Sequence, residues 1–186
     1  MVTAAAIQKL PTSLRPVTDE QGANAAVSLI LKPEAEDFEI LLVKRAIRQT
    51  DPWSGQMALP GGKREPQDAN LKATAIRETL EETGIDLRES LFLGVLDAVH
   101  SEPRRDLRIL PFVVQLRGEP EVKLNFGELD AYLWVPYETI IQSRGKTVQP
   151  DFGEVSAFLL QDEVVWGITY KILQNLHRTL QALTAQ

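Results

Sequence analysis

Cysteine is absent from this sequence of 186 residues, and histidine occurs only twice, at His100 and His177. The absence of cysteine excludes disulfide frameworks, cysteine–zinc sites, iron–sulfur clusters and thiol nucleophiles. Because the two histidines lie far apart in the sequence, we do not expect a metal site built from imidazole ligands. Metal chemistry in this protein would therefore depend on oxygen ligands.

Positive charge and long apolar runs are also scarce. The 20 lysines and arginines are outnumbered by 26 acidic residues, which gives a formal net charge of -6. This sign opposes binding to nucleic acids and to anionic membranes. No apolar run approaches the roughly 20 residues of a membrane-spanning helix, and the first residues lack a secretory signal pattern. We expect a cytoplasmic protein that binds neither nucleic acid nor membrane.

The length and composition are typical of one globular domain. Hydrophobic residues make up 44% and charged residues 25% of the chain, both ordinary values for soluble domains. Residues 1–22 contain two prolines and little periodicity, and are predicted to form an irregular or partly helical arm. Residues 23–186 show no repeat and no second hydrophobic block, which predicts a single domain.

Strands and helices are predicted from residue type and apolar spacing. The predicted strands are residues 25–31, 38–45, 57–59, 91–99, 107–116, 131–135 and 155–160. The predicted helices are residues 69–83, 137–143 and 164–183, and residues 59–63 are predicted to form a tight loop around the chain-breaking residues 60–62. Strands mixed with two long helices predict an α/β or α+β fold.

The helix predicted over residues 69–83 is the best defined. Asp68 is predicted as its N-cap, and Gly84 stands where a glycine ends a helix. One face of this helix is apolar, and we expect it to pack against the core. The residues on that face are Ala73, Ile76 and Leu80.

The opposite face of the same helix carries three carboxylates within an arc of about 100°, namely Glu78, Glu81 and Glu82. They repel one another, and the helix macrodipole disfavours negative charge near the C-terminus. Divalent cations would remove both penalties, and oxygen ligands favour Mg²⁺ or Mn²⁺. Arg77 is spaced to reach Glu81. A solvated acidic face is the alternative. The preceding Gly61-Gly62-Lys63 segment, which could present carbonyls to a metal and amides to a phosphate, opposes that alternative.

This segment resembles the Nudix box, the loop–helix–loop motif of the Nudix hydrolases. The resemblance is carried by Gly62 and by Arg77-Glu78-Xaa-Xaa-Glu81-Glu82-Xaa-Gly84-Ile85. It implies an α/β/α sandwich around a mixed β-sheet, and hydrolysis of a nucleoside diphosphate linked to another moiety, with Mg²⁺ or Mn²⁺. The family pattern has a first glutamate where this sequence has Ala69. We expect the neighbouring Asp68 to cap or orient the helix, and metal binding to be intact.

The resemblance also implies roles for single residues. Glu78 and Glu82 are expected as metal ligands, Glu81 as a shared ligand or general base, and the Gly62 carbonyl as a further ligand. Arg77 is expected to orient Glu81. Glu128 is expected as a base or metal ligand from outside the helix, with an ordinary surface carboxylate as the alternative.

Three further segments resemble the coenzyme A diphosphatase branch of the family: residues 41–46, 55–62 and 165–169. The resemblance implies cleavage of coenzyme A or a derivative to 3′,5′-ADP and 4′-phosphopantetheine. Leu59 stands where the branch has an aromatic residue. The alternative substrates are ADP-ribose, dinucleotides and oxidised nucleotides, and a different class is a catalytically silent nucleotide-binding module.

Basic and aromatic residues near these motifs are candidates for substrate contacts. Guanidinium and ammonium groups suit phosphate oxygens, and the candidates are Arg45, Arg48, Lys63 and Arg64. Trp53 fits either stacking on a base or anchoring its loop. Trp166 opens the last predicted helix and is expected in the core. The sequence is also compatible with a homodimer.

Overall fold

The computed structural model describes residues 4–49, 53–102 and 104–185. Eight strands form the main sheet and three form a second sheet. The main sheet comprises β1 (Ala25–Pro33), β2 (Phe38–Arg45), β3 (Met57–Ala58), β4 (Gly61–Lys63), β5 (Leu91–Val95), β6 (Val99–His100), β7 (Arg108–Gln115) and β8 (Leu129–Pro136). The second comprises β9 (Arg144–Gln149), β10 (Gly153–Leu160) and β11 (Glu163–Trp166). The α-helices are α1 (Ala4–Lys9), α2 (Leu71–Thr83), α3 (Tyr137–Gln142) and α4 (Gly167–Thr184), with 3₁₀ turns at Leu10–Thr12 and Leu87–Glu89.

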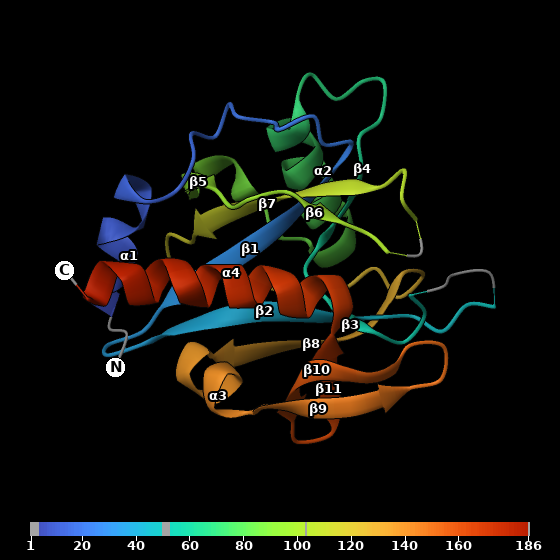
Figure 1. The fold of residues 1–186 in the computed structure, drawn as a ribbon. Helices are drawn as coiled ribbons and strands as arrows, with labels where there is room; N and C mark the ends of the chain where they lie inside the picture. The colour runs from blue at the N-terminus through green and yellow to red at the C-terminus, as the bar shows by residue number, and fades with distance from the viewer. Residues whose placement is uncertain (1–3, 50–52, 103, 186) are drawn as a thin grey trace.

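Strand β1 lies at the centre of the main sheet (Figure 1). It pairs in parallel with β7, with Ala25 opposite Ile109, and antiparallel with β2 and β4. β2 continues the sheet to β8 along its other edge. Parallel and antiparallel pairs in one sheet confirm the predicted mixed α and β fold.

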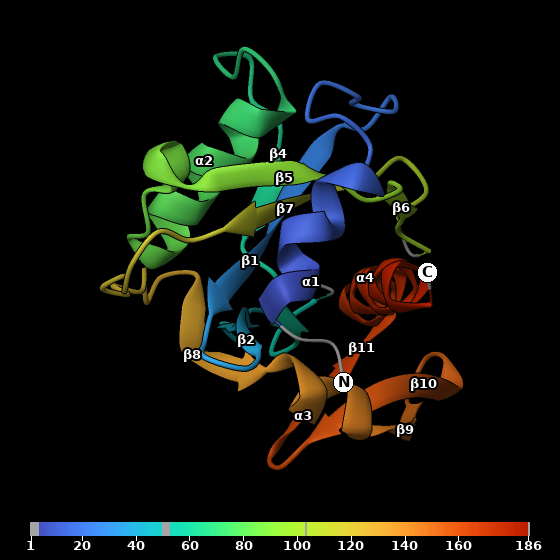
Figure 2. The same ribbon diagram turned by 90° about the vertical axis from the view of Figure 1, so that its left-hand side faces the viewer.

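The two faces of β1 pack against different helices because successive side chains of a strand point to opposite faces. Leu29 and Leu31 belong to the core shared with α1 and α4, whereas Ala26 and Ile30 belong to the core shared with α2. Figure 2 shows α2 on one side of the sheet and α4 on the other. This arrangement is the expected α/β/α sandwich. Each fully buried leucine contributes about 1.5–3 kcal/mol to its stability.

The segment predicted as an arm contributes to this core. Ile7 in α1 and Leu10 just after it are almost completely buried, and both belong to the cluster that contains the apolar residues of α4. None of the helices in the described part of the chain has the length and apolar character needed to cross a membrane.

The start of α2 differs from the prediction. The helix begins at Leu71, and its N-cap is Asn70, whose side chain accepts a hydrogen bond of 2.9 Å from the Ala73 amide. The prediction that Asp68 caps the helix is wrong, because the Asp68 carboxylate instead accepts hydrogen bonds from Arg77 and Thr74. Gly84 ends the helix in the left-handed conformation, as predicted.

The prediction for the buried face of α2 is also wrong. Leu80 is 41% exposed, and Ala73 and Ile76 are only partly buried. The helix turns another face to the sheet, where the Thr79 hydroxyl donates a hydrogen bond of 2.8 Å to Ser28 in β1. The buried residues are Leu71, Thr74, Ala75, Thr79, Glu82 and Thr83. Two of the three carboxylates therefore lie toward the sheet, and not opposite it.

Several strand assignments and the start of the last helix also differ from expectation. Residues 61–63 pair with β1 as β4, where a loop was predicted. The strand predicted over residues 91–99 divides into β5, which has an irregular register between Phe92 and Gly94, and the separate β6. β11 occupies the predicted first turn of the last helix, and Gly167, with a φ of 62°, separates it from α4. β9 was missed because its exposed, polar residues lack an apolar alternation.

Candidate active site

Helix α2 packs on β1 and β4, which brings Glu82 against the backbone of the β4 glycines. The Gly61 amide donates a hydrogen bond of 2.9 Å to Glu82 Oε2. Gly61 has a φ of 152°, and a Cβ at this position would lie 2.2 Å from the Ala26 carbonyl oxygen. Only glycine can adopt this conformation so close to β1, and the carboxylate–amide contact depends on it.

Gly62 creates the space for the second carboxylate. A Cβ at residue 62 would lie 2.5 Å from both the carboxyl carbon and Oε1 of Glu78. The backbone of β4 and the carboxylate of α2 therefore meet at the distance that only a residue without a side chain permits. The structure thus brings together three of the predicted metal ligands, Gly62, Glu78 and Glu82.

Burial sets the electrostatics of these two carboxylates. It raises the pKa of Glu82 to about 8, against the opposing effects of the Gly61 amide and the positive charge of Arg45. The pKa of Glu78 is also raised, because the effect of desolvation exceeds the opposing effect of the neighbouring Arg77 guanidinium. Like-charge repulsion from Glu78 also raises the pKa of Glu82, and repulsion from Glu81 raises the pKa of Glu78. A cation at this place would favour the ionised forms.

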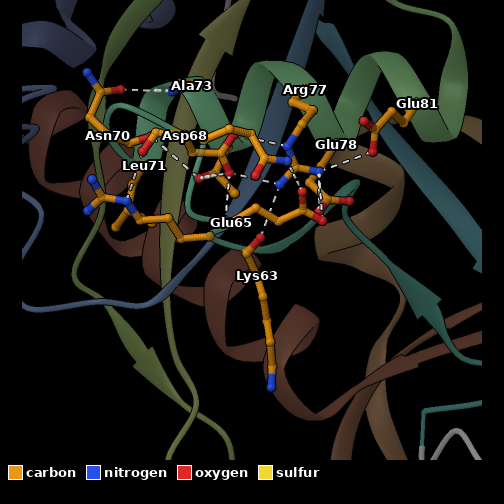
Figure 3. A network of polar contacts seen from close by, with 12 residues as sticks. Lys63, Glu65, Asp68, Asn70, Leu71, Ala73, Arg77, Glu78 and Glu81 are labelled. Carbon is orange, nitrogen blue, oxygen red and sulfur yellow. Dashed lines mark hydrogen bonds and ion pairs between the residues drawn. The ribbon is translucent and has the colours of Figure 1, made fainter.

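Arg77 is the centre of the polar network in Figure 3. Its Nη1 atom lies 2.9 Å from Glu78 Oε1 and 3.1 Å from Glu81 Oε2. The second contact has the predicted spacing of one helical turn. Its Nη2 atom also donates to the Lys63 carbonyl at 3.2 Å. Arg77 therefore orients two of the three carboxylates and fixes the helix to the end of β4.

Asp68 holds Arg77 in turn. Its carboxylate accepts hydrogen bonds of 3.0 Å from Nε and 2.8 Å from Nη2, a bidentate contact, and one from the Thr74 hydroxyl at 2.9 Å. The guanidinium holds the pKa of Asp68 well below its usual range. Of the two expectations for Asp68, capping and orientation, the structure thus shows the second. Asp68 thus places a carboxylate next to Ala69, the position at which the family pattern has a glutamate.

The two remaining acidic candidates lie nearer the solvent. The Glu81 side chain is 54% exposed. Glu128 lies in the loop before β8, and its Oε1 accepts a hydrogen bond of 3.0 Å from Asn125, whose backbone amide donates to the Glu82 carbonyl. The negative charge of Glu128 raises the pKa of both Glu78 and Glu82. The fold therefore brings Glu128 close enough for its charge to act on the helix carboxylates.

The donor set fits a hard divalent cation. Among the described residues no three carboxylate or imidazole side chains already surround a metal position, because Arg77 holds Glu78 and Glu81 while Gly61 holds Glu82. The available donors are nevertheless all oxygens, as Mg²⁺ and Mn²⁺ prefer. Two of them are the carboxylates of the buried Glu82 and the partly buried Glu78, whose pKa values are raised by desolvation.

A cavity of about 520 Å³ adjoins the β4 glycines. Among the four basic candidates, Arg45 and Lys63 line this cavity. Arg64 does not, and it donates to the Ala69 carbonyl at 2.8 Å and pairs with Glu20 at 3.6 Å. Arg48 is also outside the cavity and lies near Gly127. The structure therefore brings two of the four basic residues to the candidate site.

Two aromatic residues of the cavity wall were missed. The rings of Phe152 and Trp166 lie 5.3 Å apart at an interplanar angle of 59°, and both line the cavity with Trp53. The sequence predicted Trp166 as core, but its side chain is only partly buried. No local pattern could reveal this wall, because it exists only where the second sheet meets the first.

The chain matches known proteins over most of its length. A family model described as NUDIX domain matches residues 22–155. The peroxisomal coenzyme A diphosphatase ndx-8 of Caenorhabditis elegans is 34% identical over 129 residues, which cover 67% of this chain and 54% of that protein. The uncharacterized Nudix hydrolase NudL of Pectobacterium atrosepticum is 28% identical over 90% of this chain and 87% of its own length. The chain spans about a third to three fifths of the first curated relatives it matches.

Solved structures show the same fold. The NUDIX domain of Shewanella oneidensis NrtR, complexed with ADP ribose, matches with a TM-score of 0.56 at 14% identity, over 93% of this chain and 97% of that one. A Caenorhabditis elegans Ap4A hydrolase matches with a TM-score of 0.54 at 18% identity, over 87% and 96%. The domain match and the carboxylate helix packed on a double glycine together show that this chain belongs to the Nudix family.

Proposed function

We propose that the protein hydrolyses the diphosphate bridge of a nucleoside diphosphate linked to another moiety, with the help of a divalent cation. The observation that carries this proposal is the approach of Glu78 and Glu82 to Gly61 and Gly62 at the edge of a cavity. Placing one buried and one partly buried carboxylate against glycine backbone carries a desolvation cost that helix packing does not require. Hydrolysis of a charged diphosphate with a bound cation would give these carboxylates a function.

The chain's own residues divide the work. Glu78, Glu82 and the Gly62 carbonyl would hold Mg²⁺ or Mn²⁺, which neutralises phosphate charge and lowers the pKa of water when bound. Arg77 positions Glu81, and Asp68 positions Arg77. Glu81 and Glu128 are the candidate bases, because both are exposed enough to meet water and lie beside the buried pair.

Coenzyme A or a derivative is the proposed substrate. The relatives ndx-8 of Caenorhabditis elegans, at 34% identity, and NUDT8 of Mus musculus, at 28%, are named coenzyme A diphosphatases. The three segments that resemble this branch lie around the cavity or lead into it, and Arg45 and Lys63 line it. Its volume of about 520 Å³ lies within the range of small-molecule sites. ADP-ribose, bound by the similar NrtR domain, is the second candidate.

Product analysis with a substrate panel tests the proposal. Purified protein is incubated with coenzyme A, ADP-ribose, NADH, a dinucleoside polyphosphate and an oxidised nucleotide, in Mg²⁺, Mn²⁺ or EDTA. We expect 3′,5′-ADP and 4′-phosphopantetheine from coenzyme A, and no products in EDTA. Cleavage of ADP-ribose without cleavage of coenzyme A would contradict the substrate. Tight binding of a nucleotide that stays uncut would indicate a silent binding module.

The location of the protein in the cell and its oligomeric state stay predictions. The two relatives named as coenzyme A diphosphatases are called peroxisomal and mitochondrial, so the cytoplasmic location expected for this chain needs direct localisation. A homodimer is tested by the molar mass of the purified protein in solution.

A further inference from the structure

The cavity beside the β4 glycines has two unlike walls. The wall from the main sheet includes residues with small side chains or none, namely Ala25, Ala26, Ala58, Gly61 and Gly62, beside larger apolar residues such as Val27, Met57 and Ile109. The wall from the second sheet and the start of α4 carries the rings of Phe152 and Trp166. Aromatic rings in an apolar wall suit a ligand with a flat ring system.

The aromatic wall is fixed to the main sheet. Lys44 in β2 forms an ion pair of 2.6 Å with Glu163 in β11. At the start of α4, the Thr169 hydroxyl donates a hydrogen bond of 3.2 Å to the Met57 carbonyl in β3. Phe152 contacts Trp166 and supports it from the side. The cavity is therefore formed before a ligand enters, which reduces the entropy lost on binding.

Gln56 and Ser156 are two uncharged polar residues of the cavity lining, which also includes charged residues such as Arg45, Lys63 and Glu102. The side chains of Gln56 and Ser156 form no hydrogen bond within residues 4–49, 53–102 and 104–185. A heterocyclic base has apolar faces and a polar edge, so it can contact the rings and also satisfy these two groups. A plain alkyl chain would displace water from them and give nothing in return.

We propose that this cavity binds the heteroaromatic base of the nucleotide substrate, with Trp166 as a stacking, specificity-determining residue. The inference rests on the proposed function, because Gly62 and Lys63 line the same cavity and would place the diphosphate at its edge. Trp166 lies beyond residue 155, where the family match ends.

Binding of AMP and of ribose 5-phosphate, measured in EDTA, tests the inference without turnover. The two probes share a sugar phosphate and differ by the base. We expect AMP to quench tryptophan fluorescence and to bind more tightly than ribose 5-phosphate. Calorimetry measures the affinity for AMP. Trp166→Leu should weaken this affinity about five- to a hundredfold, the usual effect of losing one base–aromatic stack. Its effect on ribose 5-phosphate should be less than about twofold.

Matched variants separate stacking from a role in folding. Trp166→Phe keeps an aromatic face and should retain most of the AMP affinity. Gln56→Met changes a side chain that forms no internal hydrogen bond, and should weaken AMP binding while the melting temperature stays the same. Trp134→Phe is the control, because Trp134 lies outside the cavity, with the Lys32 Nζ atom 5.2 Å from the centroid of its ring. It should leave both affinities unchanged.

Equal binding of AMP and ribose 5-phosphate, or AMP binding that Trp166→Leu and Gln56→Met leave intact, would overturn the inference. So would pantetheine binding that depends on Trp166 while AMP binding does not, because the cavity would then take the other half of the substrate. The proposed function is judged separately. A protein that binds AMP through Trp166 but cleaves nothing would refute the hydrolase and leave the base site standing.

Discussion

Gly62 and Glu78 meet so closely that a Cβ atom at residue 62 would lie 2.5 Å from the glutamate's carboxyl oxygen Oε1. The two residues come from different elements, β4 and α2, and the position of each depends on the other. The glycine leaves the space that a carboxylate fills, and the carboxylate is buried because that space exists. The same pair supplies one carboxylate and one carbonyl to the proposed metal site.

Gly62→Ala should therefore displace Glu78. The new methyl group must push the carboxylate away, because the opposing contacts fall far below van der Waals distance. Because the displaced atoms are the end of a flexible side chain, we expect a loss of no more than about 1 kcal/mol in unfolding free energy, and a loss of metal-dependent turnover out of proportion to it. Urea unfolding and steady-state kinetics measure both.

The double variant Gly62→Ala/Glu78→Ala distinguishes the clash from other effects. Removing the carboxylate relieves the steric conflict, so stability should recover relative to Gly62→Ala while activity stays lost. Non-additivity is expected for residues in direct contact. Additive effects on stability would show that the glycine and the carboxylate do not oppose each other.

Glu82→Gln should nearly abolish turnover and preserve the fold. The amide oxygen of glutamine can still accept the hydrogen bond from the Gly61 amide, but the charge for a cation is gone. Loss of a partner outside the ligand set typically costs 10–100-fold, so we expect a larger decrease in kcat here. Circular dichroism checks the fold, and a titration with Mn²⁺ checks metal affinity. A fully active variant at low metal concentration would show that Glu82 is not a ligand.

Asp68→Asn should lower the free energy of unfolding at neutral pH, and lower it less in acid. The Asp68 pKa is depressed by Arg77, so its stabilising contribution is complete above the ordinary carboxyl pKa of about 4 and is lost as pH falls toward the folded-state value. Removing one partner of a buried ion pair costs about 3–5 kcal/mol. Melting curves from pH 7 to pH 3 should show the difference between the two proteins shrinking. A difference that is constant with pH would exclude the charge as its cause.

Arg45→Ala should raise the KM for coenzyme A about ten- to a hundredfold, whereas Arg48→Ala should change it little. Arg45 lines the cavity and its charge reaches Glu82, but Arg48 lies near Gly127 and outside the cavity. The magnitude follows from losing a charged hydrogen bond of about 1.5–3 kcal/mol. Comparison with dephospho-coenzyme A identifies the phosphate. A greater effect on coenzyme A points to the 3′-phosphate, and equal effects on both substrates point to the diphosphate.

The sequence alone determined the chemistry-bearing segment of this protein. The spacing of Arg77, Glu78, Glu81 and Glu82 after a double glycine is a local property, because one helix and one turn position all these residues. The same local signals predicted the end of α2 at Gly84 and the reach of Arg77 to Glu81, and the structure shows both. The mixed fold followed from the order of strands and helices.

Tertiary contacts decided which side of that helix is buried and what surrounds it. Leu80 is exposed and Glu82 buried because polar contacts with Ser28 and Gly61 orient α2. Apolar spacing cannot weigh such contacts against hydrophobic burial. Asp68 was open to two roles in the sequence, and only the nearby guanidinium of Arg77 selected one. Trp166 became part of a cavity wall because β11 packs beside β3, a meeting of residues more than a hundred positions apart that no local pattern contains.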